Sequence, residues 1–139
     1  MAEIISKGQF SMKIEHIALW VKDLEKMKYF YMEYFNMTCG EKYENKNKRF
    51  SSYFLAFESG ARIEIMYRPD ISEQAGKKGV TYGLTHLAIS VGSKEKVNKL
   101  TELIRNDGFE IVGEPRMTGD GFYESIISDP EGNHIEITE

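Results

Sequence analysis

The chain is written twice, and this internal repeat constrains its fold more than any other feature. The first copy opens on EHIALWV, residues 15–21, and the second on THLAISV, residues 85–91. Both stretches follow the pattern x-H-[I/L]-A-[L/I]-x-V, with 70 residues between His16 and His86. A repeat of this period indicates two structural modules of the same kind.

The two copies also end alike. GARIEIM, residues 60–66, and GNHIEIT, residues 132–138, each place an Ile-Glu-Ile triplet at the same distance after a glycine. The offset between Glu64 and Glu136 is 72 residues, close to the offset between the two histidines. We therefore interpret the chain as a tandem duplication.

Hydrophobic periodicity predicts the same elements in each copy. Each opening strand is followed by an amphipathic helix, over residues 24–36 and 94–108, because apolar side chains recur there at helical spacing. Three strand-like runs follow each helix, at residues 41–50, 51–58 and 61–67 in the first copy and 109–115, 122–129 and 134–138 in the second. The predicted fold class is α+β, with two tandem βαβββ modules.

Chain length predicts one domain, because 139 residues is a typical domain size. Module one spans about residues 13–68 and module two about residues 83–139. The segment between them, about residues 69–82, carries Gly, Pro and charged residues and is typical of a linker. Because half of this chain would bury only a marginal core alone, the two modules must pack together or against modules of another chain.

Strand alternation places four candidate ligands on equivalent faces. Side chains alternate between the two faces of a strand, so the aliphatic residues of each strand pack under the helices and their neighbours point away. The residues that point away include two imidazoles and two carboxylates, His16, Glu64, His86 and Glu136. A single His or Glu on a strand is usually a solvated surface residue. Here a His and a Glu recur at equivalent positions of both repeats, which instead indicates a divalent-metal site with mixed nitrogen and oxygen donors. His134 shares the parity of Glu136 but has no histidine counterpart, and we expect it to be exposed.

Composition excludes several classes of function. A net charge of −4, a pI near 5.5 and no dense Lys/Arg run argue against a surface for nucleic acid or anionic membranes. No apolar run approaches the roughly 20 residues of a membrane span, and the opening MAEIISKGQF lacks the pattern of a signal peptide. We expect a cytoplasmic protein. The one cysteine, Cys39, excludes an intrachain disulfide and a cysteine-based zinc site.

Four stretches carry a family resemblance: HIALWVKDLEKMKYFY, IEIMY, HLAISV and DPEGNHIEI. From about Lys13 to its C-terminus, the chain resembles the glyoxalase I branch of the vicinal oxygen chelate superfamily, which also contains bleomycin resistance proteins and dioxygenases. The resemblance implies paired modules that form a half-barrel metal-binding cleft. It implies that His16, Glu64, His86 and Glu136 coordinate one divalent metal, with Ni, Zn, Co and Mn as the candidates.

The same resemblance implies an activity. It is that of a glyoxalase I, or lactoylglutathione lyase, in which a proton moves through a metal-stabilised enediolate. Glu136 would be the base, and Glu64 would be a ligand and second acid/base. The resemblance further implies a small-molecule substrate, glutathione or another thiol as co-substrate, and a homodimer. The four ligands would come from one chain, or His16 and Glu64 of one chain would face His86 and Glu136 of the other.

Two positions depart from the glutathione-dependent relatives. Those relatives place an Arg four residues after the first His and an Asn four residues after the first Glu, where they hold the γ-glutamyl end of glutathione. This chain has Trp20 and Arg68 at those spacings, and both are candidate substrate-binding residues. Arg68 lies at the start of the linker, where it would either reach a substrate carboxylate or be solvated. Trp20 shares the parity of His16, so we expect an apolar ring in the cleft where a charged fork would lie. We therefore predict a thiol adduct other than that of glutathione, or a hydroxy-carbonyl compound, as the better substrate.

Three alternatives remain open on this resemblance. An acyl-CoA epimerase would use the same enolate chemistry, but that branch usually carries Gln at the position of Glu64. An iron-dependent extradiol dioxygenase would need two histidines and one carboxylate only. A non-catalytic drug-sequestering protein keeps the fold but often lacks the metal ligands, all four of which are present here.

Overall fold

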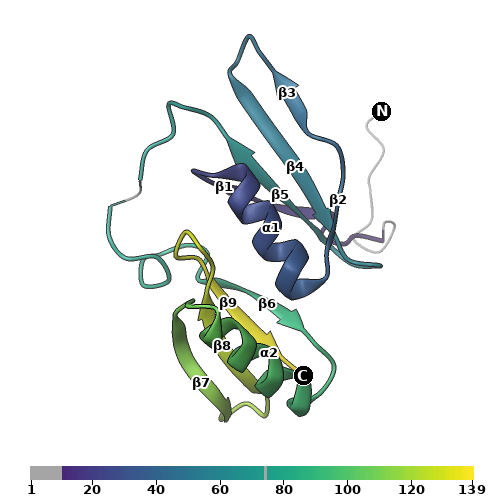
Figure 1. Ribbon diagram of the computed structural model, residues 1–139, viewed down its shortest axis with the longest axis vertical. Coiled ribbons are helices and arrows are strands. Elements are labelled where there is room, and N and C mark those ends of the chain that lie inside the picture. Colours follow the sequence, from purple (N-terminus) through teal and green to yellow (C-terminus); the bar gives the residue numbers. More distant parts are fainter. Residues whose placement is uncertain (1–10, 74) are drawn as a thin grey trace, which may run out of the picture.

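The computed structural model describes residues 11–73 and 75–139, and it contains both modules that the repeat predicts (Figure 1). The first comprises β1 (His16–Trp20), α1 (Leu24–Phe35), β2 (Thr38–Cys39), β3 (Tyr43–Asn45), β4 (Phe50–Ala56) and β5 (Arg62–Tyr67). The second comprises β6 (His86–Ser90), α2 (Lys94–Asn106), β7 (Ile111–Met117), β8 (Tyr123–Ser128) and β9 (His134–Thr138). The α+β class is confirmed. Within the described residues, neither helix is long and apolar enough to cross a membrane.

Each module has its own sheet, and the two sheets share a plan. The first has the strand order β1-β5-β4-β2, with β3 also paired to β4, and the second has the order β6-β9-β8-β7. In each sheet the opening and closing strands are parallel neighbours. Ala18 lies opposite Glu64 in the first sheet and Ala88 lies opposite Glu136 in the second. The duplication therefore extends to the pairing register, which sets where each His lies relative to its Glu.

The run at residues 41–50, expected to be a solvated edge strand or a loop, contains both a short strand and a turn, because the chain turns back within it. β3 ends at Asn45, and β4 begins at Phe50. The Asn45 side chain accepts a hydrogen bond from the Lys48 amide at 3.2 Å, and Arg49 has a left-handed backbone with φ 54°. Such a side-chain bond to nearby backbone is what allows asparagine to start a turn.

Both helices begin at the expected residues and end slightly earlier than predicted. Asp23 caps α1 by accepting from the Lys26 amide at 3.0 Å, and Ser93 caps α2 by accepting from the Lys96 amide at 3.2 Å. Asn36 ends α1 in the left-handed conformation, with φ 52°. These caps satisfy amide groups that have no partner within the helix.

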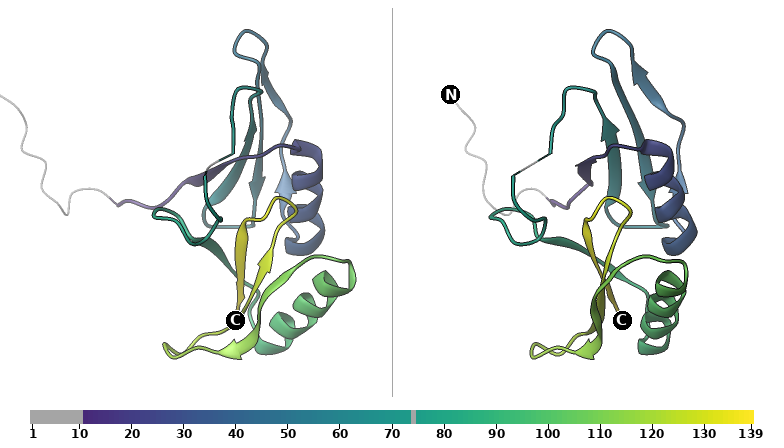
Figure 2. Two further views of the ribbon diagram at one scale, coloured as in Figure 1. Left: turned by 90° about the vertical axis from the view of Figure 1, so that its left-hand side faces the viewer. Right: turned by 60° about the vertical axis from the view of Figure 1, so that its left-hand side comes forward.

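The core lies between the helices and one face of each sheet. Figure 2 shows both helices on the same side of the two sheets. The isoleucines that flank the two glutamates, Ile63, Ile65, Ile135 and Ile137, are at most 5% exposed. The strand parity read from the sequence is therefore correct. The opposite surface, the helix-distal face, carries the four candidate ligands.

Helix α1 joins the modules. The Phe109 ring packs against Phe30 and Tyr34, with centroid distances of 5.1 and 5.5 Å. The buried Tyr31 hydroxyl donates to Asp129 at 2.8 Å. The Glu131 carboxylate accepts from the backbone amides of Lys22 and Asp23 at 2.7–3.0 Å. The modules are thus held together at the helix layer, while each sheet is hydrogen-bonded within its own module.

Candidate functional site

The first half-site consists of His16 on β1 and Glu64 on β5. Their register brings His16 Nε2 to 3.7 Å from Glu64 Oε1. On the other side of the imidazole, Nδ1 lies 3.1 Å from the Glu15 carboxylate, and the ring stands edge-on to Phe54 at 5.2 Å. These contacts orient the imidazole so that Nε2 faces Glu64, the arrangement in which a ligating histidine is held by its second nitrogen.

The second half-site consists of His86 on β6 and Glu136 on β9. His86 Nε2 lies 3.1 Å from Glu136 Oε1, and the glutamate side chain is only 15% exposed. Thr138, two residues further along β9, has a buried Oγ1 with no hydrogen-bond partner among the described residues. The half-site is therefore sheltered, and it retains an unused polar atom beside it.

Both His–Glu pairs fit a shared metal ion. Two ligands that each lie about 2.0–2.2 Å from one ion are separated by about 3.0 to 3.6 Å in octahedral or tetrahedral coordination. The separations of 3.7 and 3.1 Å lie close to that range. Mixed imidazole and carboxylate donors suit Zn, Ni, Co and Mn alike. Each half-site thus provides two ligands with suitable chemistry and spacing.

The chain does not bring the two half-sites together. Across residues 11–73 and 75–139, no three His, Cys, Asp or Glu side chains are grouped so that they would hold one metal ion. The two pairs lie on separate sheets, which are joined through the helix layer. Within the described residues, the structure therefore shows two separate His–Glu pairs.

Glu124 on β8 is a further carboxylate at the second half-site, and the sequence pattern does not single it out. Burial and the neighbouring Glu136 carboxylate raise the pKa of Glu124 above its ordinary value. The alternation of polar and apolar residues does not show which face of β8 is packed, because Ser125 points into the core. Its hydroxyl lies 2.8 Å from that of Thr101 on α2. A strand that buries a serine gives little sign of which of its faces is packed.

The linker covers His134, contrary to the expectation that this residue is exposed. Gly79 approaches so closely that a Cβ atom there would lie 2.6 Å from His134 Nδ1. A cavity of about 150 Å³ separates the linker from the start of module two and includes His86 in its lining. The lining residues are Leu19, Lys78, Gly79, Thr81, Leu84, Thr85, His86, Leu87, Asn133 and His134. The linker therefore borders the second half-site.

Trp20 and Arg68 contact each other beside the first half-site. Trp20 is 40% exposed and stands edge-on to Phe50 with 6.2 Å between the ring centroids. The Arg68 guanidinium carbon lies 5.2 Å from the Trp20 ring centroid, and Nε donates to Asp70 at 2.5 Å. The guanidinium of Arg68 lowers the pKa of Asp70. Trp20 therefore lies on the expected face, with a positive charge over its ring.

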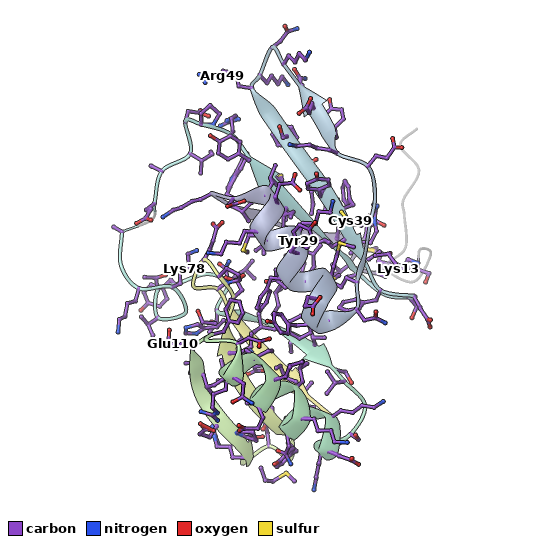
Figure 3. The ribbon with its side chains drawn as sticks, in the orientation of Figure 1. Lys13, Tyr29, Cys39, Arg49, Lys78 and Glu110 are labelled. Carbon is purple, nitrogen blue, oxygen red and sulfur yellow. The ribbon has the colours of Figure 1, made fainter. Side chains whose placement is uncertain are left out.

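A basic pocket adjoins this pair where β4 begins and β5 ends. It has a volume of about 480 Å³ and is lined by Asn47, Lys48, Arg49, Arg68, Pro69 and Asp70, a set called the basic pocket below. Figure 3 shows Arg49 at the turn between β3 and β4. This turn and Arg68 lie far apart in the sequence, and the antiparallel pairing of β4 with β5 brings them together.

Comparison with known proteins gives a family match over nearly the whole chain. The model of the Glyoxalase/Bleomycin resistance protein/Dioxygenase superfamily matches residues 13–137. A probable lactoylglutathione lyase of Vibrio cholerae is 30% identical over 129 residues, which cover 90% of this chain and 88% of that protein. A lactoylglutathione lyase of Haemophilus influenzae is 29% identical over 132 residues, covering 92% of this chain and 93% of that protein.

Plant relatives are longer. A lactoylglutathione lyase of Arabidopsis thaliana is 29% identical over 126 residues, and the match covers 88% of this chain but only 42% of that protein. The chain thus spans less than half the length of its plant relatives. Among solved structures, glyoxalase I from Zea mays has a TM-score of 0.74 and 25% identity, covering 91% of this chain and 44% of the maize chain. The trypanothione-dependent glyoxalase I of Leishmania major has the same TM-score and identity, covering 93% of this chain and 87% of that chain.

Proposed function

We propose that this chain, which belongs to the Glyoxalase/Bleomycin resistance protein/Dioxygenase superfamily, is a metal-dependent lyase/isomerase of the glyoxalase I type. Lactoylglutathione lyases among its relatives support this reaction class. The observation that carries the proposal is the pair of equivalent half-sites, with His–Glu separations of 3.7 and 3.1 Å and one shared register. Both half-sites retain both ligands, as a metal-dependent member of the superfamily needs.

The proposed assembly is a homodimer with shared sites. His16 and Glu64 of one chain face His86 and Glu136 of the other, since the described part of a single chain leaves the two pairs apart. Exposed apolar side chains support such an association: Met12, Ile14, Val80, Tyr82 and Leu84 are each at least 64% exposed.

The proposed chemistry assigns different tasks to the side chains. A divalent ion held by the four ligands would act as a Lewis acid on two adjacent substrate oxygens and stabilise an enediolate. Glu136 accepts the carbon-bound proton and returns it to the neighbouring carbon, and Glu64 acts as the second acid/base. Glu15 and Phe54 hold the His16 ring in place. Ala18 and Ala88, which lie opposite the two glutamates in register, leave room for a substrate between the ligands.

Metal titration with an activity assay tests this function. We expect protein purified without chelators to contain a divalent metal, and the chelated protein to rebind Ni²⁺, Co²⁺, Mn²⁺ or Zn²⁺ at about one ion per shared site. The reconstituted protein should isomerise a 2-oxoaldehyde–thiol hemithioacetal. A protein that binds none of these metals would contradict the site, and one that binds metal without turnover of any thiol adduct would contradict the reaction class.

A further inference from the structure

We propose that Arg62 is a positioning residue which, acting through Glu15, holds the His16 imidazole with the unshared electron pair of Nε2 free for a metal ion. The proposal rests on the proposed function, in which His16 is a metal ligand. Arg62 lies on β5, directly opposite His16 in the parallel register of β1 and β5. It is two residues from Glu64 and therefore shares its face of the strand.

The Glu15 carboxylate links Arg62 to His16. Its Oε1 accepts from Arg62 Nε at 3.1 Å and also from Nη2 of the same guanidinium. The same oxygen lies 3.1 Å from His16 Nδ1. An ionised carboxylate can only accept hydrogen bonds, so the imidazole donates from Nδ1 and keeps its unshared electron pair on Nε2. Nε2 is the nitrogen that faces Glu64, as a shared metal ion requires.

Phe54 on β4 fixes the guanidinium that holds Glu15. The Arg62 guanidinium carbon lies 4.1 Å from the Phe54 ring centroid, a distance at which a cation is attracted to the face of the ring. The same phenyl ring stands edge-on to the His16 imidazole, with 5.2 Å between the centroids. The four side chains thus form a closed set of contacts around the imidazole, and Arg62 is the member that contacts both Glu15 and Phe54.

The second half-site has the same two ligands without this arrangement. The equivalent positions of the second module carry none of the three supporting side chains; they are occupied by Thr85, His134 and Ile126. The fold therefore forms a His–Glu pair without a carboxylate and a guanidinium at these positions. The side chains of Arg62 and Glu15 are 39% and 62% exposed, and ion pairs so exposed add little to folding stability. Orientation of a ligand accounts for the arrangement, whereas the needs of the fold do not.

The sign of one substitution separates this role from the effect of charge alone. Arg62 is a cation beside a site for a cation, so charge alone predicts that Arg62→Gln binds Ni²⁺ more tightly. The positioning role predicts the opposite, a loss of about tenfold in affinity, as is typical for residues that orient a metal ligand. Glu15→Gln should cause a loss at least as large. In the Glu15→Gln background, Arg62→Gln should cause no further loss, because Arg62 acts through Glu15.

Calorimetric Ni²⁺ titration of the unmodified protein, the two single variants and the double variant tests these expectations. Arg105→Gln is the matched control, because Arg105 is 38% exposed and pairs with Glu102 and Glu114 in the second module. It should bind Ni²⁺ like the unmodified protein. Unchanged or tighter binding of Ni²⁺ by Arg62→Gln overturns the proposal, as does an equal loss in Arg105→Gln.

The metal-free protein gives a second readout that does not depend on the metal site. The chain has three histidines, so nitrogen NMR at mildly alkaline pH can identify the His16 signals by comparison with His16→Ala. We expect the proton on Nδ1 in the unmodified protein and in Arg105→Gln, and a shift of the proton toward Nε2 in Glu15→Gln and Arg62→Gln. A proton that stays on Nδ1 in both variants overturns the proposal. A protein that shows the expected shift but binds no Ni²⁺ would instead contradict the proposed metal site.

Discussion

The Arg68 guanidinium carbon lies 5.2 Å from the centroid of the Trp20 ring, so a residue after β5 places a positive charge over an aromatic ring of β1. The sequence predicts an apolar ring at Trp20 in place of the arginine of glutathione-dependent relatives. The structure adds a cation from the other departing position, Arg68. Positive charge is thus present near the first half-site. It comes from Arg68, which lines the basic pocket with Lys48 and Arg49, and not from a residue of β1.

The absence of an arginine on β1 affects which thiol co-substrate the protein is expected to use. We predict weak turnover of the hemithioacetal of methylglyoxal and glutathione, because the γ-glutamyl end of glutathione would meet the Trp20 ring at the position where glutathione-dependent relatives place an arginine. Loss of a partner for a charged group costs a few kcal/mol, or on the order of a hundredfold in affinity. The measurement is kcat/KM for this adduct with each metal reconstituted. A value of about 10⁶ M⁻¹s⁻¹ or more would show that the departures at Trp20 and Arg68 have no effect.

Arg49→Asn should make the protein more stable. A non-glycine residue with φ 54° is strained unless, like asparagine, it tolerates the left-handed region. We expect the free energy of unfolding to rise by about 0.5–1 kcal/mol. Chemical denaturation measures this, with Lys48→Gln in the same turn as a control that should change stability by less than about 0.5 kcal/mol. A loss of stability in Arg49→Asn would show that Arg49 supports the turn itself.

Tyr31→Phe should weaken the contact between the modules. The Tyr31 hydroxyl is buried and donates to Asp129 at 2.8 Å, which links α1 to the loop before β9. Removing a hydrogen bond to a charged group typically costs about 1.5–3 kcal/mol of unfolding free energy. Tyr29→Phe on the same helix is the matched control, because Tyr29 is 69% exposed and should contribute little. Equal stability of the two variants would exclude this link as a stabilising contact.

Stability should also decrease at alkaline pH. Burial, followed by the charge of Asp129, raises the pKa of Tyr31 well above its ordinary value of 10.0. Burial and the hydrogen bond to Asp107 raise the pKa of Tyr34 to about 12. A raised folded-state pKa favours the protonated phenol, so this stabilisation is complete below about pH 10 and is lost as the pH rises further. Denaturation between about pH 9 and 12 should show the loss, and Tyr31→Phe should reduce its slope. A pH-independent free energy of unfolding across this interval would contradict the assignment.

Much of the fold could be predicted from the sequence, because the duplication shows each pattern twice. Alternation around Ile63 and Ile65, and again around Ile135 and Ile137, assigns the packed face correctly. The sequence left residues 41–49 open between an edge strand and a loop, since the turn at residues 46–49 depends on the Asn45 side chain and on a left-handed Arg49. Charged residues in such a run fit an exposed strand and an exposed turn equally well.

The candidate site was less predictable, because it depends on packing between elements distant in sequence. Repeat symmetry identifies His16, Glu64, His86 and Glu136, but it carries no information on whether one chain brings both pairs together. Their separation follows from contacts of α1 with module two, such as those of Phe30 with Phe109. Glu124 was missed because its strand buries Ser125, whose polar side chain is satisfied by Thr101.

Two defective chains should restore one metal site when they are combined in a heterodimer. In a dimer with shared sites, a His16→Ala chain and a Glu136→Ala chain together leave one site with all four ligands. The matched control combines His16→Ala with Glu64→Ala, in which both sites lack a ligand from module one. Each homodimer should bind Ni²⁺ at least about a hundredfold more weakly than the unmodified protein.

The most direct measurement is a Ni²⁺ titration of these heterodimers, produced by co-expression with two different affinity tags. We predict about one tight Ni²⁺ per His16→Ala/Glu136→Ala heterodimer, at the affinity of the unmodified protein, and none in the His16→Ala/Glu64→Ala control. Absence of a tight site in both heterodimers, while the unmodified protein binds Ni²⁺ tightly, would contradict a site shared between two chains.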